Sequence, residues 1–143
     1  MKKAFVIALS ISLLIFSCFA KSNTRDNESE LLARIVHAES KGEPYLGQVS
    51  VAAVILNRID SPDFPNTLAG VIYQPGAFEP VSNGTINQEV PKDASARRAA
   101  QEALNGYDPT GGCLYFYNPS TAKSKWIWSK QIVKTIGKHN FAK

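Results

Sequence analysis

LLARIVHAESKGEPYLGQVSVAAVILN, residues 31–57, predicts two helices joined by a short turn. The first helix should begin at Asn27 as its N-cap and stop at Gly42. Pro44 is well placed to start the second helix, which should run to about Asn57. Because this second helix is apolar nearly all round, we expect it to be the buried centre of the domain.

Glu39 lies on the apolar face of the first predicted helix. It shares a stripe with Leu32, Ile35 and Val36, which precede it by seven, four and three residues. A carboxylate there should be poorly solvated, which raises its pKa and keeps it protonated nearer neutral pH, as a general acid requires. The alternative is a structural glutamate that pairs with a nearby base such as Arg34.

Shorter elements are predicted downstream of these two helices. A helix capped by Asn66 or Thr67 should run to Ile72, and Asn83-Gly84 predicts a small two-stranded ribbon within residues 77–87. Asp93 should cap a helix over residues 94–104. A strand over residues 113–117 and a last short stretch over residues 133–136 complete the pattern. The expected class is α+β, mainly helical, with a minor antiparallel sheet.

The N-terminal residues 1–20 have the pattern of an export signal: a basic start, an apolar run and a small residue, Ala20, before the cleavage point. The protein is therefore expected in the cell envelope, in the periplasm or outside the cell. An uncleaved anchor is an alternative. Lipid anchoring at Cys18 fits less well, because Phe16 and Phe19 do not suit a lipoprotein box.

Residues 21–30 are polar and predict a flexible leader, and residues 31–143 suffice for one compact domain. Without Lys2 and Lys3 the net charge falls from +4 to +2 (14 basic against 12 acidic residues), which is too balanced to indicate nucleic acid. Cys113 would then be the single cysteine, and no spacing fits a zinc site. The sequence gives no indication of a cofactor, and a monomer is the default.

Blocks of residues along 31–141 carry a resemblance to a known family. They are ARIVHAESKGEPYLGQV at 33–49, VAAVILNR at 51–58, GVIYQPGAF at 70–78, ALNGYDPTGG at 103–112, YNP at 117–119, KWIW at 125–128 and IGKH at 136–139. In this order they resemble the spore-cortex-lytic, or cell wall hydrolase, family, and several blocks of multiple residues are far more specific than one short pattern.

The resemblance implies that residues 31–143 are a cell wall hydrolase catalytic domain with a lysozyme-like fold related to lytic transglycosylases. It implies peptidoglycan as substrate, with the spore cortex and its muramic lactam suggested by the family name, and Glu39 as catalytic acid. A regulatory partner is not indicated.

Glu39 alone would suffice for a lytic transglycosylase that cuts the MurNAc–GlcNAc bond and leaves anhydro-muramic ends. The alternative is a hydrolytic muramidase, which needs a second carboxylate. Glu79 is its first candidate, followed by Glu43, Asp63 and Glu89.

The sugar-binding residues should be aromatic or carry polar groups, because sugar rings present C–H faces together with amides and hydroxyls. The candidates are Tyr73, Gln74, Phe78, Glu79, Tyr117, Asn118 and Trp126. Trp128 and Phe116 are expected in the core instead.

Three rival interpretations involve other chemistry. A wall peptidase could use Cys113 as nucleophile and His139 as base, although Cys113 opens an apolar strand rather than a helix. A non-catalytic peptidoglycan-binding module would leave Glu39 idle. A zinc site at His37 lacks the further ligands it needs, so no metal is expected.

Overall fold

The computed structural model describes residues 21 and 23–143, so the predicted export signal lies outside the described residues. The first helix covers residues 23–40 and is followed by α2 (Tyr45–Asp60), α3 (Leu68–Ile72), α4 (Glu79–Ser82), the 3-10 turn η1 (Thr85–Asn87), α5 (Ser95–Leu104), β1 (Tyr115–Tyr117), η2 (Lys125–Ser129), β2 (Ile132–Ile136) and β3 (His139–Ala142). The predicted class, mainly helical with a small antiparallel sheet, is confirmed. Within the described part of the chain, no helix combines the length and apolar character needed to cross a membrane.

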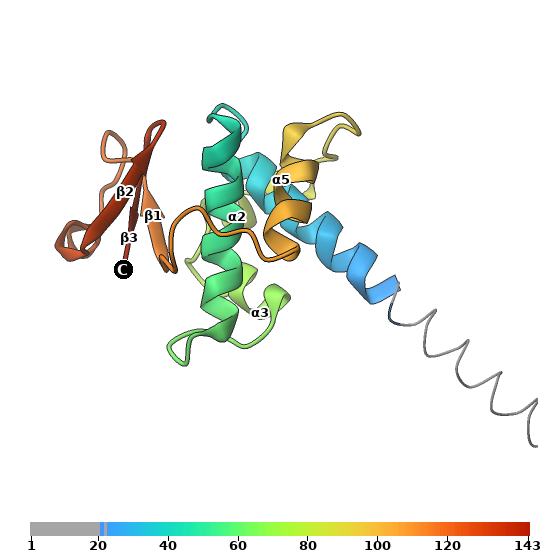
Figure 1. The fold of residues 1–143 in the computed structure, drawn as a ribbon, viewed down its shortest axis with the longest axis horizontal. Coiled ribbons are helices and arrows are strands. Elements are labelled where there is room, and N and C mark those ends of the chain that lie inside the picture. The colour runs from blue at the N-terminus through green and yellow to red at the C-terminus, as the bar shows by residue number, and fades with distance from the viewer. Residues whose placement is uncertain (1–20, 22) are drawn as a thin grey trace, which may run out of the picture.

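Helix α2 forms the buried centre of the molecule, as the sequence predicts (Figure 1). It contacts α5, α3 and β1. Figure 1 shows it standing between the sheet on one side and α5 with the first helix on the other. Its residues from Gly47 to Ile55 are all buried, because an all-round apolar helix can be covered on every face.

The first helix presents Leu32, Ile35 and Val36 to the core, and all three are fully buried. It begins earlier than the sequence predicts, so Asn27 is not its N-cap. Residues 23–30, expected to form a flexible leader, are helical in the structure. No glycine or proline interrupts residues 23–41, and the helix can therefore continue through this polar segment.

The sheet has the strand order β1-β3-β2, with both pairs antiparallel. The central strand β3 is absent from the sequence-based prediction, although its Phe141 is fully buried. Gly137 and Lys138 connect β2 to β3, and Gly137 has a φ of +57°. A glycine at the first central position of a two-residue connection is typical of a type II′ hairpin turn.

Two local predictions are wrong. Residues 77–87 form α4 and η1 rather than a ribbon, because Pro80 lies in the first turn of a helix and Gly84, at φ +82°, follows its C-cap. Asp93 does not cap α5, whose N-cap is Ala94 with no side-chain hydrogen bond.

Glu43 holds the hairpin turn between β2 and β3 against the start of α2. Its Oε2 accepts a hydrogen bond from the backbone N–H of Lys138 at 3.0 Å, and its Oε1 lies 3.8 Å from Nδ1 of His139. The Glu43 side chain is only 8% exposed, so its carboxylate is held between the hairpin turn and α2. This contact fixes the sheet to the helical part of the fold.

Gly137→Ala should therefore destabilise the protein much more than Gly111→Ala. Both glycines have positive φ, but an added Cβ at Gly137 would overlap Glu43 Oε2 and lie 2.7 Å from Pro44 Cδ, whereas at Gly111 it meets nothing within 4 Å. We expect a loss of about 2–4 kcal/mol at Gly137 and about 1 kcal/mol at Gly111 in the free energy of unfolding. Urea unfolding measures both, and equal losses would contradict this packing of the hairpin turn.

Candidate active site

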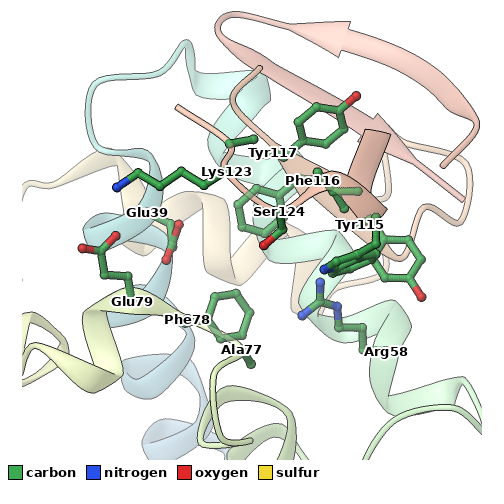
Figure 2. A pocket seen from close by; sticks show the side chains of 13 residues that line it. Glu39, Arg58, Ala77, Phe78, Glu79, Tyr115, Phe116, Tyr117, Lys123 and Ser124 are labelled. Atoms are coloured by element: carbon green, nitrogen blue, oxygen red, sulfur yellow. The ribbon is translucent and has the colours of Figure 1, made fainter. Parts of the chain in front are cut away.

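A pocket of about 380 Å³ opens between the first helix, α2, the start of α4 and the β1–η2 segment (Figure 2). Charged, aromatic and small side chains from all these segments meet in it. The lining residues are Glu39, Arg58, Ala77, Phe78, Glu79, Tyr115, Phe116, Tyr117, Ala122, Lys123, Ser124, Trp126 and Ile127. Its volume is in the range of small-ligand sites in proteins.

Glu39 occupies this pocket from the second-to-last position of the first helix. The pKa of its carboxyl is raised to about 7, chiefly by burial and also by the charge of Glu79, while the charge of Arg58 opposes the rise. The carboxyl has no hydrogen bond or ion pair with any of the described residues. A half-protonated, unpaired carboxyl at neutral pH can give and take a proton, as general acid–base catalysis requires.

The structural alternative for Glu39, an ion pair with Arg34, is absent from the structure. Arg34 instead bonds Glu30 one turn earlier, with Nε 3.2 Å from Oε1. Arg97 binds the second oxygen of Glu30 and ties the first helix to α5. Arg34 is thus paired with Glu30 away from the pocket, and it forms no ion pair with Glu39.

Glu79 begins α4 beside Glu39, and Figure 2 shows the two carboxyl groups near one another. The Glu79 side chain is exposed. A second hollow, lined by Ala38, Pro80, Asn83 and Thr85, shares both glutamates with the main pocket. The two hollows therefore meet at the carboxylates, and a chain-like substrate could extend to both sides of Glu39.

Aromatic rings form the opposite wall. Tyr115 packs edge-on against Trp126 at 5.6 Å between ring centroids, and Phe78 stacks on Phe116 at 6.4 Å. Trp126 is 57% exposed, so much of its indole is accessible to a ligand. Rings of this kind suit the C–H faces of sugars.

The sugar-binding candidates from the sequence separate into two groups in the structure. Phe78, Glu79, Tyr117 and Trp126 line the pocket, whereas the remaining three, Tyr73, Gln74 and Asn118, lie outside it. Tyr73 is 50% exposed and is the C-cap residue of α3. The Asn118 side chain accepts a hydrogen bond from Ser120 N–H and so caps its own turn.

The expected core position of Trp128 is wrong, and that of Phe116 is met in part. Trp128 is 51% exposed and packs on Tyr117 at the surface. Phe116 is partly buried and packs against the core, and it also lines the pocket.

Arg58, Tyr115, Lys123 and Ser124 line the pocket without having been predicted from the sequence. For Arg58 a signal exists. It follows Val54 by four residues and Ile55 by three, on a helix whose other faces are apolar. Burial of the Arg58 charge at that position needs a structural or functional explanation, as burial of the Glu39 carboxyl does.

The Cys113 and His139 pair lacks the features of a nucleophile and its base. Cys113 is fully buried, burial raises the pKa of its thiol, and its Sγ donates to the carbonyl of Thr110. His139 lies between the rings of Phe116 and Phe141 and beside Glu43. A thiol nucleophile needs a lowered pKa and access to substrate.

In residues 21 and 23–143, no three histidine, cysteine or acidic side chains are grouped so that they could hold a metal ion. His37, two residues before Glu39, is not among the lining residues of the pocket.

Sequence comparison relates the chain to known proteins. The model of the Cell Wall Hydrolase family matches residues 42–142. The chain belongs to this family. The spore cortex-lytic enzyme of Bacillus cereus is 54% identical over 117 residues, which cover 82% of this chain and 44% of that enzyme. The chain thus spans less than half the length of this relative. Glu39 precedes the family match by three residues, so its role rests on the pocket geometry.

Two solved structures resemble the fold closely. The catalytic domain of the Bacillus cereus SleB protein superposes with a TM-score of 0.76 at 53% identity, covering 82% of this chain and 91% of that domain. The catalytic domain of the germination-specific lytic transglycosylase SleB from Bacillus anthracis gives 0.77 at 53% identity, covering 82% and 94%. These matches confirm the predicted lysozyme-like fold and the family resemblance.

Proposed function

We propose that this protein cleaves the glycan strands of peptidoglycan at the MurNAc–GlcNAc bond, as a lytic transglycosylase. The observation that carries the proposal is Glu39, an unpaired carboxyl with a pKa of about 7 at the centre of an aromatic-walled pocket. The relatives named spore cortex-lytic enzymes support peptidoglycan, including the cortex with its muramic lactam, as substrate. The site of action is outside the cytoplasm, and the protein acts as a monomer.

Glu39 performs both proton transfers in this mechanism. Its neutral carboxyl protonates the glycosidic oxygen while the bond from that oxygen to the muramic C1 breaks. The substrate's own N-acetyl group can stabilise the cation that develops at C1. The Glu39 carboxylate then accepts the proton of the muramic C6 hydroxyl as its oxygen bonds to C1. An internal anhydro ring forms, no water is consumed, and Glu39 is neutral again.

The positions of Glu43 and Glu79 favour a reaction that uses Glu39 as its single carboxylate over hydrolysis, which needs a second one. Glu43 is held by the hairpin turn and by His139, so it is not free to activate water. Glu79 reaches the pocket but is exposed, and its charge raises the pKa of Glu39. In our proposal Glu79 therefore has a supporting electrostatic role. The name of the Bacillus anthracis relative, a lytic transglycosylase, agrees with this choice.

The pH dependence of cleavage tests the proposal. The active form carries a protonated Glu39 whose pKa is about 7, so kcat/KM should be level below about pH 6, be halved near pH 7 and approach a tenfold fall for each pH unit above about pH 8. The rate of release of soluble fragments from purified peptidoglycan measures this profile. A rate that rises through pH 8 would mean that another group is the acid.

Glu79→Gln is the informative companion variant. Removing the Glu79 charge removes one of the causes that raise the pKa of Glu39, so the fall in rate should move to lower pH. Activity at pH 5 should remain within a few-fold of the unaltered protein. If Glu79 were the second carboxylate of a hydrolase, activity would be lost at every pH.

A further inference from the structure

Arg58 is a buried cation without an ion pair in the described part of the chain. Its side chain rises from the last turn of α2 and is only 9% exposed. Nε donates to the carbonyl oxygen of Leu114 at 2.8 Å. Burying an unpaired charge is costly, and such a group calls for a physical reason.

Three aromatic rings surround the guanidinium and hold its plane. Its Cζ lies 5.0 Å from the ring centroid of Phe64, 5.4 Å from that of Phe78 and 5.8 Å from that of Tyr115. Cation–π contacts of this kind fix the orientation of an arginine but satisfy none of its N–H donors. The Nη groups of Arg58 have no acceptor among the described residues, and Arg58 lines the pocket that contains Glu39 (Figure 2).

Glu39 is not the missing acceptor. The two side chains are close enough for their charges to affect one another, yet they form no ion pair. Below about pH 7 the Glu39 carboxyl is mostly neutral, so it cannot neutralise Arg58 while it serves as an acid. The free edge of the guanidinium is therefore available to a ligand.

We propose that Arg58 is a substrate-positioning residue whose Nη groups donate hydrogen bonds to an acyl oxygen carried by an amino sugar in the pocket. A planar edge with several N–H donors matches the lone pairs of a carbonyl or carboxylate oxygen better than a single hydroxyl. Peptidoglycan sugars carry two such groups, the N-acetyl carbonyl on each ring and the lactyl carbonyl on alternate rings. The inference rests on the proposed function, because it places that substrate in the same pocket.

Kinetics of Arg58→Lys give the first test. Lysine keeps the positive charge near Glu39 but loses the planar edge, so kcat/KM on glycan strands should fall 10- to 100-fold with the alkaline fall in rate still near pH 7. Arg98→Lys is the matched control, since Arg98 lies 5.0 Å over the ring of Tyr45 and does not line the pocket. An Arg58→Lys protein with unchanged kcat/KM would overturn the proposal.

Binding measured in the Glu39→Gln variant tests the contact without altering Arg58. Nitrogen-labelled arginine should show Arg58 Nη signals that shift on addition of purified glycan strands, while the Nε signal, held by Leu114, moves less. Chito-oligosaccharides carry N-acetyl but no lactyl groups. A shift with both ligands assigns the N-acetyl carbonyl, and a shift with peptidoglycan strands alone assigns the lactyl carbonyl.

The indole signal of Trp126 distinguishes failure of this inference from failure of the proposed function, because Trp126 lines the same pocket. If strands shift the Trp126 signal and leave Arg58 Nη unchanged, the pocket binds glycan and the role of Arg58 is refuted. If neither signal moves and the unaltered protein releases no fragments from peptidoglycan, both the proposed function and the inference are refuted.

Discussion

Glu39→Gln should lower the rate of peptidoglycan cleavage on the order of 10³-fold, because glutamine cannot transfer the proton that breaks the glycosidic bond. The shape of the side chain is preserved, and the pocket around it is unchanged. Binding of glycan strands should therefore persist, with a dissociation constant within a few-fold of that of the unaltered protein. Cleavage assays and co-sedimentation with insoluble peptidoglycan measure the two quantities separately.

Glu89→Gln is the matched control for this experiment. It makes the same chemical change at an exposed glutamate that does not line the pocket. Its activity should equal that of the unaltered protein. If Glu39→Gln retained more than a tenth of the activity, a different residue would be the acid, and a non-catalytic role for the Glu39 carboxyl would be favoured.

The same substitution should make the folded protein more stable at pH 8. The folded pKa of Glu39, about 7, is above the ordinary glutamate value of 4.5, so the folded state binds more protons between these values than the unfolded state does. Stability from this group is fully present below pH 4.5 and is lost as the pH rises through 7. Glutamine avoids that loss, which amounts to on the order of 3 kcal/mol.

Urea unfolding at pH 4.5 and at pH 8 checks this expectation. The two proteins should have similar free energies of unfolding at the lower pH, and Glu39→Gln should be the more stable at the higher pH. A Glu39 that stabilises the fold through an ion pair predicts the opposite, a loss of stability at pH 8. The stability gain and the activity loss together are typical of a site strained for function.

The helices could be predicted because their signals are local. The apolar stripe of the first helix and the all-round apolar α2 determine their own burial, and the placement of Glu39 follows from its spacing to Leu32 and Val36. The α4 region could not be predicted in the same way, since Asn83-Gly84 suits a hairpin turn as well as a helix end. The pairing of β3 between β1 and β2 depends on long-range contacts that its four residues do not reveal.

The candidate site also contains residues that could be predicted from the sequence and residues that could not. Glu39 and Phe78 could be predicted because a carboxylate on a core stripe and a large ring in a turn both need a tertiary explanation. Tyr73 and Trp126 have equivalent aromatic character in sequence, but only Trp126 reaches the pocket. Their side chains are oriented by turns of the backbone whose relative positions emerge only in the folded chain.

Mass spectrometry of the fragments released from purified peptidoglycan in heavy-oxygen water tests the central claim most directly. A transglycosylase that uses Glu39 as its single acid and base forms the anhydro ring from the substrate's own C6 hydroxyl. The account therefore predicts anhydro-muramic ends that carry no heavy oxygen and that are absent when Glu39→Gln replaces the unaltered protein. Reducing muramic ends containing heavy oxygen would show that water is the nucleophile and would contradict the one-carboxylate mechanism.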